Sequence, residues 1–191
     1  MIAYKFLERG AIAPFTRFAW PTDGRWIDAR KSGDGGGIHA CRARDLPYWV
    51  SDELWRVELS DPVREREAQI EAARGRLVIR VAEWNPRDFA AACAFRARDL
   101  ALQALADDTL AQASTLDELI AAARSISAAD RFEAEMIGYI VDAAVRAKEA
   151  HAGSASHTAA VAAVALHGTE AAFEEERAWQ AKLLVDSLKL A

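Results

Sequence analysis

The chain has 191 residues, of which 52% are hydrophobic and 28% charged, and its formal net charge at pH 7 is -5. Its apolar runs are too short for a transmembrane protein, and the composition excludes a disordered chain and a coiled-coil rod. The acidic balance argues against nucleic-acid binding or attachment to an anionic membrane as the main activity.

No part of the sequence indicates a cofactor or a secretory signal. The two cysteines, Cys41 and Cys93, match no metal or redox spacing and are expected to be reduced thiols. No G-x-G-x-x-G or Walker A pattern occurs, so we expect no bound nucleotide cofactor. The first residues lack the basic lead and the long apolar stretch of a secretory signal, which predicts a cytoplasmic protein.

The composition changes near Pro86. All five prolines and five of the six tryptophans lie in residues 1–86, whereas residues 87–191 contain no proline and are nearly a third alanine, the best helix former. Residues 1–86 carry 14 basic and 13 acidic side chains, and residues 87–191 carry 10 and 16. We predict an α+β protein with two domains: a small mixed or antiparallel sheet domain over 1–86 and an acidic, alanine-rich helical bundle over 87–191.

The first domain is predicted to consist of short strands. Runs rich in aromatic or β-branched residues, bounded by turn residues, occur at 2–7, 25–29, 37–41, 54–59 and 77–83. In the fourth run apolar and charged residues alternate, as in a sheet that is covered on one face. Residues 42–49 are expected to form a short helix or turn broken at Pro47. Residues 63–74 are ambiguous between helix and strand, and strand is slightly favoured.

The second domain is predicted to be a compact antiparallel bundle of four or five helices. Helix starts are indicated at Asn85, at the Thr115 capping box, near Asp130, at Ser156 or Thr158, and near Glu170. Apolar residues recur at steps of three and four in the third helix, which indicates one buried stripe: Phe132, Met136, Ile140, Ala143 and Ala147. The last helix is expected to bury Phe173, Trp179, Leu183, Leu184 and Leu188.

Four stretches of the second half follow one another in the order of a known family. They are AAACAFRARDLA, TLDELIAAARS, AAVRAKEAHAGSASHTAAVAAVALHG and EEERAWQAKLL, within residues 90–186. In this order the chain resembles an all-helical family assigned to immunity against bacterial polymorphic toxins. It departs from that family by having Ala-Ser-Thr-Leu at 113–116 in place of a Pro-Asp-Arg-Pro stretch. The resemblance implies a helical module that binds and neutralises a protein, with no established chemistry.

The first half contains YKFL, PF, RW, GIHAC and LWRVEL in an order that resembles an N-terminal module of actinobacterial proteins of unknown function. More distantly, a glycine-led strand at 37–40, a small helix at 45–49 and a strand at 55–59 resemble the order in ADP-ribosyltransferase-like folds. His39 stands where that pattern has tyrosine, and Lys5 stands where it has Arg or His. This likeness implies a nucleotide-binding protein or an enzyme of that kind.

His39 is the most suggestive single residue for catalysis. It follows three glycines, Gly35, Gly36 and Gly37, which let a ligand approach the backbone closely. With a carboxylate such as Glu58 or Glu53 nearby, it would serve as a general base or orient a substrate. One histidine and one carboxylate do not define a site, so we favour a structural, hydrogen-bonded histidine.

Other features have plain structural interpretations. The tryptophans of the first half are expected in the core, except that Tyr48 and Trp49 cannot both point inward after Pro47. The spacing of the histidines at 151, 157 and 167 does not place them on one helix face, which argues against a metal site. The acidic run at 174–176 is explained by the positive end of the helix dipole.

Two functions are therefore left open. We favour a non-enzymatic module that binds a protein partner, such as a toxin, through acid-rich helix faces. Its candidate contact residues are Trp49, Asp107, Asp108, Asp117, Glu133, Glu135 and Asp142. The alternative is a nucleotide-binding protein or ADP-ribosyltransferase-like enzyme with His39, Tyr48 and Glu58 in its site; those residues share a cleft only if their strands are neighbours.

Overall fold

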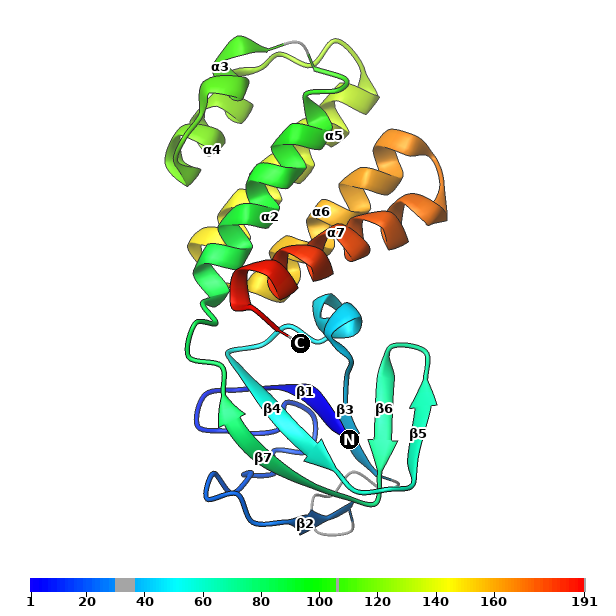
Figure 1. Cartoon of the computed structure of the whole chain (residues 1–191). Helices are drawn as coiled ribbons and strands as arrows, with labels where there is room; N and C mark the ends of the chain where they lie inside the picture. Colours follow the sequence, from blue (N-terminus) through cyan, green and yellow to red (C-terminus); the bar gives the residue numbers. More distant parts are fainter. Residues whose placement is uncertain (30–36, 106, 191) are drawn as a thin grey trace. The chain divides into compact units, whose positions relative to one another are not determined.

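The computed structural model describes residues 1–29, 37–105 and 107–190 (Figure 1). Antiparallel strands occur between residues 2 and 80, and helices between 86 and 188, which confirms the α+β class and the change of fold near Pro86. Residue contacts divide the chain into two compact units. The sheet unit is Met1–Trp84 together with the segment from Ala181 onward, and the helical unit is Asn85–Gln180.

The sheet unit contains two antiparallel sheets. The first has the order β1-β4-β7-β2, with β1 at Ile2–Leu7, β4 at Glu53–Leu59, β7 at Arg74–Arg80 and β2 at Ile27–Asp28. The second has the order β3-β6-β5, with β3 at Ile38–Ala40, β6 at Gln69–Ala72 and β5 at Val63–Arg66. Figure 1 shows β1, β4 and β7 side by side and β5 and β6 as a hairpin.

Both sheets contribute to one apolar core. Ala3, Val57 and Leu77 lie opposite one another across β1, β4 and β7, and all three are buried. Ile38 and Ile70 from the second sheet belong to the same cluster. The alternation in β4 therefore predicted the buried face correctly.

The strand slightly favoured for residues 63–74 is confirmed, whereas the segment around Pro47 differs from its expectation. Residues 63–74 form the β5–β6 hairpin and the start of β7, because burial of Ile70 and Ala72 overrides the helix-forming residues around Glu65. Residues Ala43–Tyr48 form a 3-10 helix, η1, that includes Pro47 instead of breaking there.

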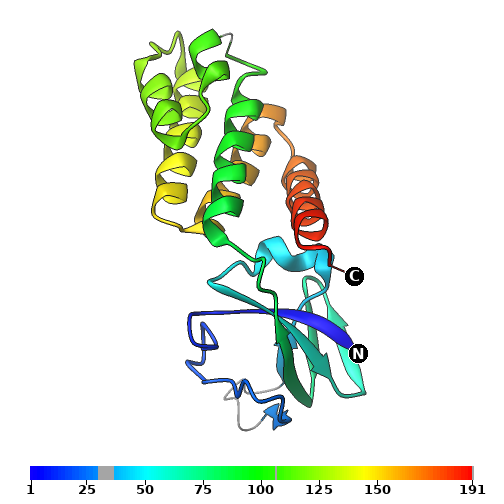
Figure 2. The ribbon, with the colours of Figure 1, turned by 60° about the vertical axis from the view of Figure 1, so that its left-hand side comes forward.

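The helical unit begins at α2, Pro86–Ala101, where the Asn85 side chain accepts a hydrogen bond from the backbone of Arg87. The later helices are α3 at Asp108–Gln112, α4 at Leu116–Ser125, α5 at Arg131–Lys148, α6 at Ala152–His167 and α7 at Glu170–Leu188. The capping box of Thr115 and Glu118 is present, and Asp130 caps α5. Helix α2 packs against both α5 and α6, and α5 packs against α4 (Figure 2).

Two expectations for the helices were wrong. Helix α6 begins at Ala152, so Ser156 and Thr158 lie inside it; the Ser156 hydroxyl donates to the Gly153 carbonyl one turn back instead of capping a helix. Phe132 is 38% exposed, whereas the other four residues of the predicted α5 stripe are buried. In the described residues no helix has both the length and the apolar character needed to cross a membrane.

The buried face of α7 also differs from the prediction. Leu184 is buried, but Phe173, Trp179, Leu183 and Leu188 are half-buried. Glu176, Arg177 and Gln180 are buried in the helical unit instead. Arginine guanidinium groups lie over the aromatic rings: that of Arg96 is 5.0 Å from the Trp179 ring, and that of Arg177 is 5.0 Å from the Phe173 ring.

Candidate functional site

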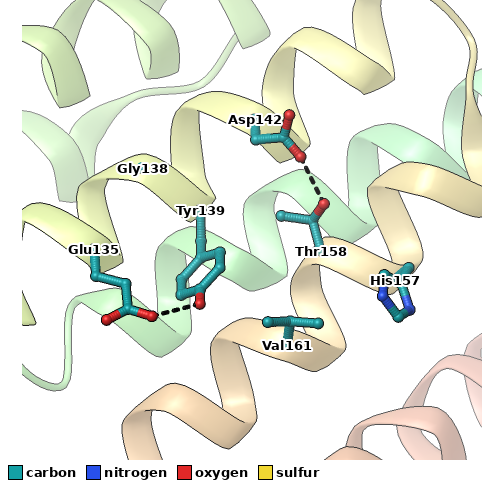
Figure 3. Close-up of a pocket in the computed structure, with 7 residues that line it drawn as sticks. All are labelled: Glu135, Gly138, Tyr139, Asp142, His157, Thr158 and Val161. Atoms are coloured by element: carbon teal, nitrogen blue, oxygen red, sulfur yellow. Dashed lines mark hydrogen bonds between the residues drawn. The ribbon is translucent and has the colours of Figure 1, made fainter.

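A groove of about 400 Å³ runs between α5 and α6 (Figure 3). Its α5 wall is formed by Glu135, Gly138, Tyr139 and Asp142, whose spacing of three, one and three places them on one helix face. Its α6 wall is formed by His157, Thr158 and Val161. Two of the acidic residues predicted as contacts, Glu135 and Asp142, therefore lie in one groove.

The two carboxylates of the groove differ in whether a basic side chain pairs with them. Thr158 donates its hydroxyl to Asp142 at 2.7 Å, and Arg146 Nε lies 3.3 Å from the other oxygen of the same carboxylate. Glu135 accepts a 2.7 Å hydrogen bond from the Tyr139 hydroxyl, and within the described residues no Lys, Arg or His forms an ion pair with it. Glu135 is thus an exposed carboxylate fixed in position without a cation.

Tyr139 acts in this groove as a hydrogen-bond donor. The hydrogen bond to Glu135, burial and the charge of Glu135 raise the pKa of Tyr139 to about 12. The phenol therefore stays protonated near neutral pH and is a poor general base. The groove thus places one exposed carboxylate beside an aromatic ring.

Gly138 leaves a gap in the α5 wall. It lies in the middle of α5, and a Cβ built on it has no atom within 4 Å. Glycine in a helix interior is less stable than alanine by about 1 kcal/mol. Packing within the described residues gives no reason for that cost, whereas a ligand passing close to the backbone would.

His157 lies next to a buried polar cluster of the helical unit. Its Nδ1 is 3.4 Å from an Arg177 nitrogen, and Arg177 also donates to the Ser156 hydroxyl and to Gln180. Glu176 is only 2% exposed and accepts from Arg96 Nε at 2.9 Å. Helix-dipole stabilisation, suggested by the sequence, does not account for this burial.

Burial changes the acidity of Glu176. It raises the pKa of that carboxyl above its ordinary value, and the hydrogen bond and charge of Arg96 offset burial only in part. The cluster ties α7 to α2 and α6 through side chains that the hydrophobic pattern does not identify. It serves here as packing for the helices that carry the groove.

Three of the other four acidic candidates are engaged in local contacts, and the fourth, Asp108, is exposed. Asp107 accepts from the backbone of Leu110 at the start of α3, and Glu133 accepts from the backbone of Ala129. Asp117 forms an ion pair with Lys148, and Asp108 is exposed in the first turn of α3. These carboxylates lie on separate elements and do not line the α5–α6 groove.

A second groove, of about 430 Å³, lies at α3 and α4. Its carboxylate, Glu118, accepts hydrogen bonds from the backbone and hydroxyl of Ser114 and from the backbone of Thr115. These bonds lower the pKa of Glu118 and use it as a helix cap. This groove lacks an aromatic side chain among its lining residues, so it offers fewer groups that could contact a cation than the α5–α6 groove does.

The three catalytic candidates lie on separate elements of the sheet unit. His39 is on β3, opposite Glu71 of β6, and its Nδ1 lies 3.2 Å from Gln69 Oε1. Glu58 is on β4, where it pairs with Arg76 at 2.6 Å. Strands β3 and β4 are not neighbours in either sheet, so the condition for a shared cleft is not met.

Tyr48 ends η1 and is 37% exposed, and the adjacent Trp49 is half-buried and donates Nε1 to the Ala68 carbonyl at 2.6 Å. Gly35 and Gly36 of the predicted glycine loop lie outside the described residues. The sequence analysis missed Glu71, the carboxylate that does face His39. Strand was slightly favoured for that segment, but the pairing of β6 with β3, which sets Glu71 opposite His39, was not predicted from the sequence.

The thiols and histidines of the described chain form no recognisable metal site. No group of three or more His, Cys, Asp or Glu side chains in residues 1–29, 37–105 and 107–190 is arranged to hold an ion. Burial, with a smaller contribution from Asp45, raises the pKa of Cys41 to about 12, and burial likewise raises that of Cys93. Both cysteines are therefore unreactive thiols near neutral pH.

Comparisons with known proteins add no assignment. No protein-family model matches the chain, no curated protein is significantly similar in sequence, and no solved structure is significantly similar in fold. The resemblances described from sequence stay predictions, and the α5–α6 groove is the feature of the described chain that best indicates a function.

Proposed function

We propose that this protein is a non-enzymatic binding module whose helical unit engages a basic surface of a protein partner through the α5–α6 groove. The observation that carries the proposal is Glu135, an exposed carboxylate held by Tyr139 and not neutralised by a cation of the described chain. A partner's cation would complete this pair. A toxin is the partner class that the sequence resemblance implies.

The charge distribution supports the same function. Residues 87–191 carry 16 acidic and 10 basic side chains. The helical half therefore attracts a basic partner electrostatically before the two proteins touch. Such attraction accelerates association and weakens as salt is added. The groove then supplies the short-range contact.

Photo-crosslinking identifies the partner. The cross-linking amino acid p-benzoylphenylalanine is placed at Val161, in the groove, and in a matched protein at Ala121, in the α3–α4 groove. Both proteins are irradiated in an extract of the source cell, and a partner of the proposed site is a protein cross-linked from position 161 but not from position 121. That protein is then purified for affinity measurements.

Charge reversal tests the contact with the purified partner. We expect Glu135→Lys to weaken binding about tenfold or more, because a cation replaces the carboxylate that pairs with the partner. Glu175→Lys makes the same charge change at an exposed position of α7 outside the groove and serves as the control. Equal weakening by both variants, or affinity unchanged in Glu135→Lys, would contradict the proposal.

A further inference from the structure

The helical unit contains two pairs of a carboxylate and an aromatic side chain one helical turn apart, with the carboxylate buried in one pair and exposed in the other. On α7, Glu176 and Trp179 are three residues apart, and Arg96 from α2 fills the site between them: its Nε lies 2.9 Å from Glu176, and its guanidinium lies 5.0 Å from the Trp179 ring. On α5, Glu135 and Tyr139 are four residues apart and lie in the groove. Each pair presents a carboxylate and a ring within one helical turn.

The second pair lacks the arginine that the first has. Arg146, two turns further along α5, is engaged with Asp142 at 3.3 Å and with Glu149 at 4.0 Å. No other guanidinium of the described residues pairs with Glu135 or lies over the Tyr139 ring. A cation bound on this pair would therefore come from another molecule.

We infer that the α5–α6 groove takes one arginine side chain of the protein partner, with its guanidinium on Glu135 and Tyr139 and its aliphatic stem over Gly138. This inference rests on the proposed function and specifies the group that the groove recognises. Figure 3 shows Glu135, Tyr139 and Val161 around the space in question, with Gly138 on the α5 backbone beside it. A Cβ built at Gly138 has no atom within 4 Å, so the space over the backbone there is open.

Arginine fits this arrangement better than lysine does. A guanidinium is planar, so it lies flat on an aromatic ring while it donates to a carboxylate in the same plane. The ammonium of lysine is a compact and strongly hydrated charge that loses more water in such a site. On α7, Arg96 contacts both the Glu176 carboxylate and the Trp179 ring, so this chain contains one example of an arginine bound by such a pair.

Asp142 is not a second cation site. Thr158 and Arg146 already satisfy both of its oxygens. The groove is therefore expected to bind one cationic group, at its Glu135 end. This asymmetry separates the inference from a general attraction of basic molecules to an acidic helix face.

The inference is tested by NMR titration of the full chain with small probes. N-acetyl-arginine methylamide is compared with N-acetyl-lysine methylamide and with N-acetyl-citrulline methylamide, a neutral analogue of the arginine probe. We expect the arginine probe to shift the Gly138 amide and Val161 methyl signals with saturation. The lysine probe should bind at least about fivefold more weakly than the arginine probe, and the citrulline probe should cause no shift.

Three variants define the site. Glu135→Gln removes the charge, and Gly138→Leu fills the space over the backbone, where no neighbouring atom lies within 4 Å of the new Cβ. Both are expected to abolish the shifts from the arginine probe. Glu175→Gln removes a charge at an exposed position outside the groove and should leave them unchanged.

Some outcomes would contradict the inference about arginine while leaving the proposed function unaffected. No saturable shift with the arginine probe, equal binding of lysine, or binding that survives Gly138→Leu would each do so. If partner binding is still lost in Glu135→Lys, the groove binds the partner by another group. If partner binding is unaffected while the arginine probe binds as expected, the proposed function fails and the groove recognises free arginine-like cations.

Discussion

Glu53 in the sheet unit and Glu176 in the helical unit are both buried, and their carboxyl groups have different partners. Glu53 in the sheet unit accepts from the backbone of Gly10 and Ala11 and from Trp55 Nε1, at 3.1 to 3.2 Å. Glu176 in the helical unit accepts from the side chains of Arg96 and Gln180. At Glu53 the Trp55 indole, two backbone N–H groups and the charge of Arg80 together outweigh burial, whereas at Glu176 the side-chain partners offset burial only in part.

The pKa directions of the two carboxyls follow from this difference. Burial alone would raise the pKa of Glu53, but the hydrogen bonds from Trp55, Gly10 and Ala11 and the charge of Arg80 lower it below its ordinary value. Burial raises the pKa of Glu176, and Arg96 offsets it only in part. Glu53 therefore stabilises the fold as an anion, whereas the folded chain favours the charged form of Glu176 less than the unfolded chain does.

The largest expected effect comes from removing Glu53. In Glu53→Ala the backbone N–H groups of Gly10 and Ala11 lose their acceptor, and Ala11 is buried with φ at +58°, a conformation that the carboxylate helps to hold. We expect unfolding free energy to fall by about 2–4 kcal/mol, because the buried N–H groups of Ala11 and Trp55 are left without an acceptor. Urea denaturation followed by circular dichroism measures this.

Glu58→Ala is the control for Glu53→Ala. Glu58 lies on the same strand but pairs with Arg76 in a partly exposed site, where loss of the ion pair costs about 0–1 kcal/mol. If both variants lost the same stability, the backbone hydrogen bonds of Glu53 would not be its main contribution.

Glu176 is predicted to make stability depend on pH in the direction opposite to Glu53. A raised folded pKa gives stability that is present below the ordinary value of 4.5 and is lost as pH rises through the folded pKa. The lowered pKa of Glu53 gives stability that is present above 4.5 and is lost as pH falls through its folded pKa.

Glu176→Gln removes the titrating group while keeping an acceptor for Arg96. We expect the variant to gain stability relative to the wild type as pH rises from about 4.5 toward neutral. Urea denaturation of both proteins at several pH values measures the difference. A difference that is constant over this range would show that Glu176 is ionised as easily as in the unfolded chain.

Local signals predicted much of the fold. The Thr115 capping box and the alternation in 54–59 each depend on a few neighbouring residues, and both appear in the structure as expected. The division near Pro86 followed from proline and alanine content. The start of α6 was misplaced because Ser156 and Thr158, which look like caps, bond to Gly153 and Asp142 inside the packed helices.

The candidate site was only half predictable. Glu135 and Asp142 belonged to the acidic residues named from sequence, but the sequence could not tell that Asp142 is neutralised and Glu135 is not. The burial of Glu176 depends on Arg96, which is 80 residues away along the chain. Gly138, by contrast, can be recognised from the sequence, because a glycine inside a predicted helix costs stability and so indicates a packing or functional role.

A third glutamate, Glu135, extends the comparison to an exposed carboxylate, and its smallest and most local effect is on Tyr139. The hydrogen bond to Glu135, burial and the charge of Glu135 raise the pKa of Tyr139 from 10.0 to about 12. In Glu135→Gln an amide oxygen still accepts the hydrogen bond, but the negative charge that opposes ionisation of the phenol is gone. We therefore expect the pKa of Tyr139 to move back toward 10.0.

Ultraviolet absorbance at alkaline pH, or the Tyr139 ring signals in NMR, reports this change. A raised pKa means that Tyr139 stabilises the fold below pH 10.0 and that this contribution is lost as pH rises toward about 12. Glu175→Gln should leave the titration unchanged, since that residue lies on another helix. An unaltered Tyr139 titration in Glu135→Gln would mean that the phenol is not held on the carboxylate, and the groove would then lack the fixed anion on which cation binding depends.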